Sequence, residues 1–144
     1  MRAREAKTHR PLPVPDSVSA PYWTAAAEHR LELARCGQCR NFAHPPDSVC
    51  PNCGSTDPGF EFVPVSGRGT VRSWTTVRQS FLPGFDDLLP FVLVDVELTE
   101  QSDLRLIGRL LDGPDVELRI GIPVVAAFEQ LTTEVSVPAF EIAS

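Results

Sequence analysis

Four cysteines in two Cys-x-x-Cys pairs constrain the fold of this chain more than any other feature. The pairs are Cys36–Cys39 and Cys50–Cys53, and ten residues separate them. Each short turn can present two thiolates to one side of a metal ion, so two such turns complete a tetrahedral site. Gly37 and Gly54 suit the tight backbone turns of rubredoxin-like knuckles. The spacing therefore predicts a metal site with four ligands: Cys36, Cys39, Cys50 and Cys53.

The nature of the ligands favours zinc in a structural role. A closed set of four thiolates is typical of structural zinc sites and leaves no position for water or substrate. Iron in the same ligand set is an alternative, and a disulfide or an empty site is another. A disulfide is disfavoured because the expected location of the chain is the cytoplasm, where thiols stay reduced. The metal is therefore expected to stabilise structure rather than to catalyse a reaction.

The 144 residues suit one compact domain with a small appendage. Three prolines among polar residues predict a disordered or linker arm over residues 1–20. Residues 21–58 are expected to form a helix, capped by Ser19 and ending near His29, followed by the zinc ribbon. The remaining residues, 59–144, are expected to form a barrel with a C-terminal tail.

Beyond the cysteines, apolar residues alternate with polar ones at the period of β-strands. The pattern predicts a mainly β fold, with a five-stranded OB-fold barrel favoured over an SH3-like barrel or a small sandwich. Because Pro138 cannot donate to a sheet, Val135–Ile142 is expected to be an edge strand or an extended tail. The other expected strands are Phe60–Phe62, Thr70–Gln79, Val92–Leu98, Leu104–Leu110 and Ile122–Phe128.

The net charge of −6 is unevenly distributed along the chain. Residues 1–40 hold seven Lys and Arg against four Asp and Glu, and residues 41–144 hold six against fifteen. An acidic body of charge −9 disfavours binding to phosphate backbones, so no nucleic-acid partner is expected. No apolar run approaches the length of a membrane-spanning helix, and the basic start precedes no apolar segment. Neither a membrane partner nor a secretory signal is therefore expected.

The sequence contains no recognisable catalytic motif. It lacks a Gly-x-Ser-x-Gly elbow, a phosphate-binding Gly-x-x-x-x-Gly-Lys loop and a His-Glu-x-x-His motif. Structural or solvated roles are favoured for His9, His29 and His44. Asp86 and Asp87 are adjacent, so their side chains would diverge rather than form an acid/base pair. We therefore expect no catalytic residue in this chain.

Two apolar segments are candidates for contact with a partner or a ligand. Residues 81–90 form an apolar loop between two strands, which fits either an interface or a plug for the barrel. Aromatic residues on the expected helix could anchor an interface or cap a small core. Trp74 fits the barrel core or surface, with ligand stacking as the alternative. The candidate contact residues are Tyr22, Trp23, Phe81, Leu82 and Phe85.

The span from Tyr22 to about Phe128 resembles a family of acyl-CoA-associated OB-fold proteins with an N-terminal helix and a rubredoxin-like zinc ribbon. Each motif is common alone, and their combination carries the resemblance. The motifs are Pro21-Tyr22-Trp23, Leu31 to Cys39, Pro45-Pro46, Cys50 to Ser55, Ser66 to Val71, Pro90–Leu98 and Arg105–Leu110.

This resemblance implies a function in a complex. Family members accompany thiolase-fold enzymes, and some are fused to MaoC-like hydratase domains in bacterial cholesterol side-chain degradation. There the OB-fold subunit is a scaffold for a lipid-transfer-protein-like thiolase homologue, which cleaves a steroid acyl-CoA by retro-aldol chemistry. The resemblance thus implies a non-catalytic subunit of a carbon-carbon lyase, with the acyl-CoA held mainly by the partner. Alternatives are a subunit of a biosynthetic thiolase or hydroxymethylglutaryl-CoA-type synthase, and a nucleic-acid-binding module.

Overall fold

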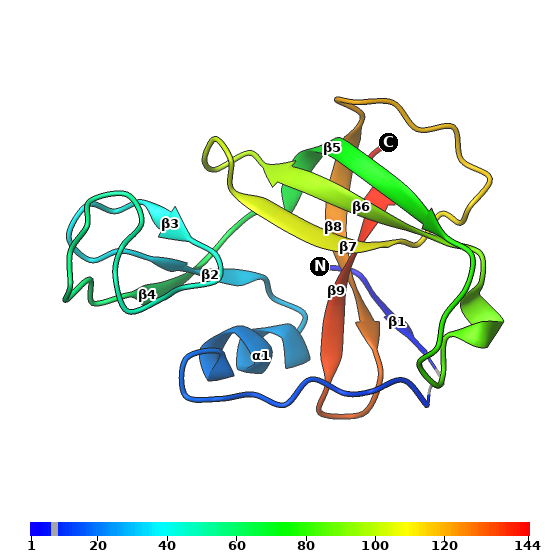
Figure 1. Ribbon diagram of the computed structural model, residues 1–144, viewed down its shortest axis with the longest axis horizontal. Coiled ribbons are helices and arrows are strands. Elements are labelled where there is room, and N and C mark those ends of the chain that lie inside the picture. Colours follow the sequence, from blue (N-terminus) through cyan, green and yellow to red (C-terminus); the bar gives the residue numbers. More distant parts are fainter. Residues whose placement is uncertain (7–8) are drawn as a thin grey trace.

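A computed structural model describes residues 1–6 and 9–144 and shows a helix, a small ribbon and a barrel (Figure 1). The helix α1 spans Ala20–Ala27 and lies beside both other parts. The ribbon is a three-stranded sheet in the order β3-β2-β4. Its strands are β2 (Glu32–Arg35), β3 (Phe42–Ala43) and β4 (Glu61–Pro64). The cysteine-bearing turns project from the end of this ribbon.

The barrel consists of five strands, as predicted, and a sixth strand extends its sheet. The strand order is β1-β8-β5-β6-β7-β9, and pairing of β8 with β9 closes the barrel. Alternate residues of β6 point inward, because Val92, Val94, Val96 and Leu98 are all buried. Phe128 and Phe140, fully buried, fill the centre of the core. The strands are β1 (Ala3–Glu5), β5 (Arg68–Val77), β6 (Phe91–Leu98), β7 (Arg105–Leu110), β8 (Pro123–Gln130) and β9 (Ser136–Ile142).

The last strand, β9, differs from its prediction as an edge strand or a tail. It pairs antiparallel with β8 over Ser136–Ile142 and parallel with β7 at two positions. Pro138 lies opposite Phe128, whose N–H donates to Arg2 on the other side of β8. The Phe128–Pro138 pair therefore makes no hydrogen bond between β8 and β9. The absence of an N–H group on Pro138 leaves no gap in the β8–β9 hydrogen-bond ladder.

The N-terminal arm is also more ordered than predicted. Strand β1 pairs parallel with the second half of β8, at residues 128–130. Strand β5 pairs with β8 only at residues 123–125, so the second half of that β8 edge is open to β1. A β-strand edge has unpaired donors and acceptors, and the arm satisfies them. The arm is therefore part of the sheet, although its prolines predict a linker.

Helix α1 begins at the predicted place, but the predicted side-chain cap is not formed. Ser19 makes no side-chain cap hydrogen bond. Instead the Asp16 carboxylate accepts the N–H groups of Val18 and Ser19. The helix ends at Ala27, and His29 follows with a left-handed φ of 60°. No helix in residues 1–6 and 9–144 is long and apolar enough to cross a membrane.

Candidate metal centre and contact surfaces

The ribbon gathers the four predicted cysteine ligands at one point. Their sulfur atoms all lie within 4.8 Å of one another. The Sγ atoms of Cys36 and Cys53 are 3.9 Å apart, and those of Cys39 and Cys50 are 3.7 Å apart. Thiolates bound at ~2.3 Å to one ion in a tetrahedron have sulfurs roughly 3.8 Å apart. None of the four forms a disulfide, so the geometry fits a four-thiolate metal site.

Two similar knuckles position these sulfurs. In the second, Gly54 has a φ of 75° and donates its N–H to Cys50 O at 2.9 Å. In the first, Arg40 takes the equivalent place, with a φ of 69° and an N–H bond to Cys36 O at 2.9 Å. Gly37 serves a different purpose from the one predicted, because a Cβ there would lie only 2.9 Å from the Gly59 carbonyl oxygen. It is required for close backbone approach rather than for the turn.

The two knuckles predict opposite effects of two substitutions. Arg40→Gly relieves a left-handed conformation that costs an ordinary residue about 1 kcal/mol, so it should stabilise the ribbon by about that amount. Gly54→Ala should destabilise the ribbon by a similar amount, because alanine is strained at a φ of 75°. No steric clash adds to this strain, since no atom lies within 4 Å of the added Cβ. Competition for metal with a chelator would measure both effects. Equal responses in the two variants would contradict this account.

Hydrogen bonds to sulfur favour the metal-binding form of the first knuckle. The Asn52 side-chain amide, at 3.5 Å, and the Asn41 backbone lower the pKa of Cys39 to about 6. The backbone N–H of Ser55 lowers the pKa of Cys53, but desolvation and the neighbouring thiols outweigh it and raise this pKa to about 11. The Cys39 thiolate therefore forms readily. Four thiolates so close together repel one another, so the full set requires a cation.

The aromatic pair on α1 lines a groove. Tyr22 and Trp23 lie edge to face, with ring centroids 4.9 Å apart. The His44 ring, from the ribbon, lies 5.5 Å from the Tyr22 ring. All three line a groove of about 520 Å³ between α1, the ribbon and the barrel. The sequence does not indicate that His44 joins the aromatic pair, because residues 24–43 separate His44 from the pair along the chain.

The predicted contact loop, residues 81–90, lies well away from α1 (Figure 1). Phe81 is 91% exposed and Leu82 is 57% exposed. Phe85, by contrast, stacks on Phe91 at 6.0 Å, and the Arg10 guanidinium lies 5.8 Å above its ring. A short 3₁₀ helix, Asp86–Leu88, follows. The five contact candidates thus belong to two separate surfaces, and the tip of the loop does not plug the barrel.

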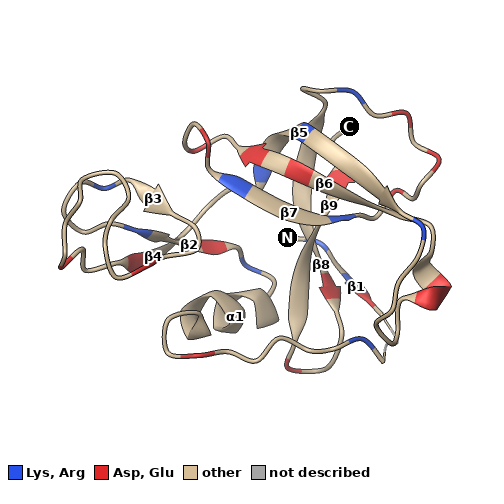
Figure 2. Ribbon diagram, viewed as in Figure 1, with Lys and Arg blue, Asp and Glu red and all other residues tan. Residues whose placement is uncertain are grey.

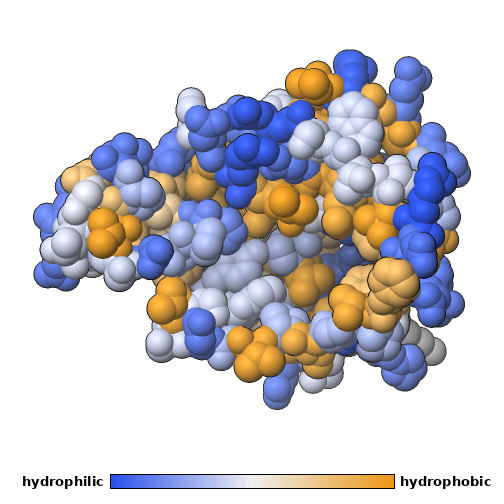
Figure 3. Space-filling view, in the orientation of Figure 1, coloured by the Kyte–Doolittle hydropathy of each residue, from blue (hydrophilic) through white to orange (hydrophobic). Residues whose placement is uncertain are grey.

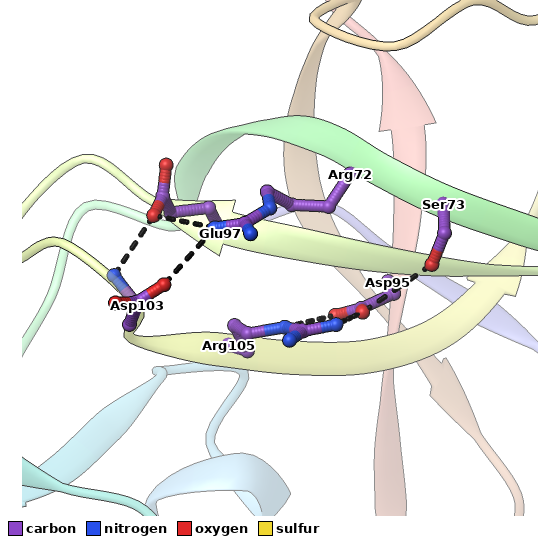
Figure 4. Close-up of polar contacts among 6 residues, drawn as sticks. All are labelled: Arg72, Ser73, Asp95, Glu97, Asp103 and Arg105. Carbon is purple, nitrogen blue, oxygen red and sulfur yellow. Dashed lines mark hydrogen bonds and ion pairs between the residues drawn. The ribbon is translucent and has the colours of Figure 1, made fainter.

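A network of polar side chains links β5, β6 and β7 on the surface of the barrel (Figure 4). Arg72 bonds to Glu97 at 3.0 Å and to Asp103 at 3.1 Å. Arg105 forms an ion pair with Asp95. Trp74, on β5, is 41% exposed and thus belongs to the barrel surface. Because carboxylates occupy both arginines, this face offers phosphate groups little positive charge.

A buried ionic cluster is a feature that the sequence did not reveal. Glu129 on β8 is 1% exposed and bonds to Arg10 at 2.7 Å and to Arg109 at 2.8 Å. Burial alone would raise the pKa of the Glu129 carboxyl, but the bonds from Arg109 and Arg10 lower it overall. Burial also lowers the pKa of His44. Residues 10 and 129 are far apart in the chain, so no local pattern signals their pairing.

Family models match both parts of the chain. A model described as the rubredoxin-like zinc ribbon domain of ChsH2 matches residues 23–59, and one described as its C-terminal OB-fold domain matches residues 62–129. The chain also superposes on a solved structure titled Ltp2-ChsH2(DUF35) aldolase, with a TM-score of 0.78 and 33% identity. That match covers 92% of this chain and 99% of the other.

Three relatives add to this comparison. A probable enoyl-CoA hydratase alpha subunit of Thermomonospora curvata is 34% identical over 95% of this chain and 41% of its own length. The 3-oxo-4,17-pregnadiene-20-carboxyl-CoA hydratase alpha subunit of Mycobacterium tuberculosis is 31% identical over 74% of this chain and 32% of its own length. A DUF35 domain-containing scaffold protein of Methanothermobacter thermautotrophicus is 27% identical over 74% of this chain and 77% of its own length. The chain thus spans less than half of either hydratase subunit.

Proposed function

The chain belongs to the ChsH2 family of zinc-ribbon and OB-fold proteins, and from this premise we propose that it is a non-catalytic accessory subunit of a thiolase-like acyl-CoA enzyme. The observation that carries the proposal is the likeness to one chain of an aldolase complex over 92% of this chain and 99% of that one. The partner would carry the residues that break the carbon-carbon bond. This chain would stabilise the partner and shape its substrate channel.

The proposed substrate is a steroid acyl-CoA, cleaved by retro-aldol chemistry in bacterial cholesterol degradation. The name of the Mycobacterium tuberculosis relative, a hydratase acting on a pregnadiene-carboxyl-CoA, supports this substrate class. A MaoC-like hydratase domain is a further proposed partner, supported by the hydratase names of two relatives. A second candidate is an accessory subunit of a biosynthetic thiolase or hydroxymethylglutaryl-CoA-type synthase. The name of the methanogen relative, a scaffold protein, supports the accessory role in either candidate.

We propose that the metal is zinc, held by the four clustered cysteines. The 3.7 and 3.9 Å sulfur separations support a tetrahedral site. When bound, the ion would fix the fold of the ribbon and would not act on substrate, because four protein sulfurs fill its coordination. A reducing compartment such as the cytoplasm would keep the thiols available to the metal.

Reconstitution tests the function directly. The chain is mixed with a purified thiolase homologue, and the thermal stability and acyl-CoA lyase activity of that homologue are measured with and without the chain. We expect a stable complex, and lyase activity that depends on this chain. A partner whose stability and activity are the same without the chain would contradict the proposal. Comparing steroid acyl-CoA with acetoacetyl-CoA as substrate separates the two candidate pathways.

The tip of the 81–90 loop is proposed to contact the partner. An exposed Phe81 and Leu82 would be buried on association, and truncation of such apolar anchors weakens binding by about 30-fold or more. Phe81→Asp is therefore expected to prevent co-purification with the thiolase homologue while the chain stays folded. Ile120→Asp is the matched control, because Ile120 is also exposed, at 75%. Equal binding by the Phe81 variant and the wild type would exclude this surface.

A further inference from the structure

The turn between β6 and β7, residues 99–104, connects the barrel to the ribbon. Figure 2 shows this turn, which carries acidic residues, pointing from the barrel toward β3. Hydrophilic residues gather on the barrel next to the ribbon in the space-filling view (Figure 3). Glu100 and Ser102 are exposed in the turn, yet Gln101 between them is half-buried. One polar side chain of the turn is therefore withdrawn from solvent.

Gln101 pairs with Phe42 of the ribbon as a neighbouring strand would. The Phe42 N–H donates to the Gln101 side-chain oxygen at 2.8 Å, and the Gln101 side-chain nitrogen donates to the Phe42 carbonyl oxygen at 3.1 Å. Phe42 lies on β3, an edge strand of the ribbon sheet. Edge strands have unpaired backbone donors and acceptors. A carboxamide offers one donor side and one acceptor side, so Gln101 satisfies both backbone groups of Phe42.

Asn41, the residue before Phe42, connects this pair to two of the metal ligands. The Asn41 carbonyl oxygen accepts the Cys36 N–H at 2.8 Å. The Asn41 N–H bonds to the Cys39 sulfur. Small domains with such sites are generally folded only when the metal is bound. The position of Phe42 opposite Gln101 therefore depends on the same bonds that hold the first cysteine turn.

We propose that metal binding in the ribbon also orders the β6–β7 turn of the barrel, and that Gln101 is the residue that couples the two. When the metal is bound, β3 is in place and both hydrogen bonds to Gln101 form. When it is removed, Phe42 is no longer held, and the Gln101 side chain turns to solvent. The same turn carries Asp103, which bonds to Arg72 on β5 at 3.1 Å. The effect of the metal thus extends to the polar network on the barrel surface.

Coupling between two sites is reciprocal, so the Gln101 hydrogen bonds should in turn strengthen metal binding. Gln101→Ala removes both bonds and should weaken metal binding about tenfold, although residue 101 is not a metal ligand. Gln101→Glu keeps an acceptor for the Phe42 N–H but places a negative charge against the Phe42 carbonyl oxygen. This second variant should weaken metal binding at least as much as the first.

Competition with a chelator measures the affinity of the full chain for Zn²⁺, the probe in this experiment. Glu100→Gln is the matched control in the same turn. In the described part of the chain, the Glu100 side chain bonds to Ser66, in the connection between β4 and β5, and to Thr99. Because neither residue belongs to β3 or to a cysteine turn, the control should bind Zn²⁺ as the wild type does. Urea unfolding checks that the barrel stays folded in all three variants.

A second measurement uses the wild-type chain and needs no substitution to fold. The side-chain amide of Gln101 gives an NMR signal, which is assigned by its absence in Gln101→Ala. With Zn²⁺ bound, this amide should be protected from exchange with solvent. After a chelator removes Zn²⁺, its signal should move to the position of a free glutamine amide. The backbone amides of the turn should also exchange faster in the metal-free chain.

Three results would overturn the inference. They are an unchanged Zn²⁺ affinity in Gln101→Ala, equal losses of affinity in Gln101→Ala and Glu100→Gln, and a Gln101 amide signal that is the same with and without Zn²⁺. If Gln101→Ala does not fold, exchange at the backbone amides of the wild-type turn, with and without Zn²⁺, decides the question. The proposed function is tested separately, because these measurements use this chain without a partner.

Discussion

Replacing Cys50 with alanine is expected to release the metal and unfold the ribbon while the barrel remains folded. Cys50 is 1% exposed, so its loss removes a ligand and a buried contact together. Metal binding to ribbons of this size is worth on the order of 10 kcal/mol, and a three-ligand site loses much of it. Most of the core around Phe128 and Phe140 comes from barrel strands, and Leu31 and Leu33 join it from the ribbon side. The barrel should therefore unfold in a separate, later transition.

Metal analysis and hydrogen exchange measure this outcome. The wild type should hold one zinc or iron ion per chain, and Cys50→Ala should hold none. Amide protection should be lost in β3 and in the cysteine turns and retained in β6. Ser48→Ala, an exposed change in the same ribbon, is the control. One bound metal ion in the Cys50 variant, or a single cooperative loss of ribbon and barrel, would contradict the prediction.

The features that sequence predicted well depend on local patterns. The two Cys-x-x-Cys turns fix their own geometry, so four thiols could be grouped from spacing alone. The inward residues of β6 follow strict alternation, and the strand was expected at Val92–Leu98 against the observed Phe91–Leu98. Family resemblance supplied the order of helix, ribbon and barrel, which composition could not.

The features that sequence missed depend on distant pairs. Pro138 predicted an edge strand or a tail over Val135–Ile142, because the sequence does not reveal the register that places it opposite Phe128. In this register the Phe128 N–H points away from β9 and donates to the Arg2 carbonyl oxygen. No sequence pattern within residues 1–20 indicates strand β1, because the strand with which β1 pairs lies at residues 128–130. The groove likewise combines segments near residues 16–23, 44–46 and 137–138. Contacts between distant segments of the chain determine all three features: strand β9, strand β1 and the groove.

The buried ionic cluster yields the second large prediction. Glu129→Gln is expected to destabilise the folded chain by about 3 kcal/mol, because it removes the carboxylate that Arg10 and Arg109 share in a buried site. Glu97→Gln is the control: it disrupts an exposed pair with Arg72 and should cost less than about 1 kcal/mol. Urea unfolding curves measure both. Equal effects of the two substitutions would show that burial does not strengthen the cluster.

Acid should weaken the wild type through the same carboxylate. The pKa of Glu129 in the folded chain is lowered from its usual 4.5, so its stabilising effect is complete above that value and is lost as the pH falls through the lowered pKa. Glu129→Gln should therefore remove part of the dependence of stability on pH below about 5. Since the Arg10 guanidinium lies over Phe85, the variant should also loosen the 81–90 loop. Weaker association with the proposed thiolase partner would then accompany the lower stability, although residue 129 is buried and cannot contact a partner.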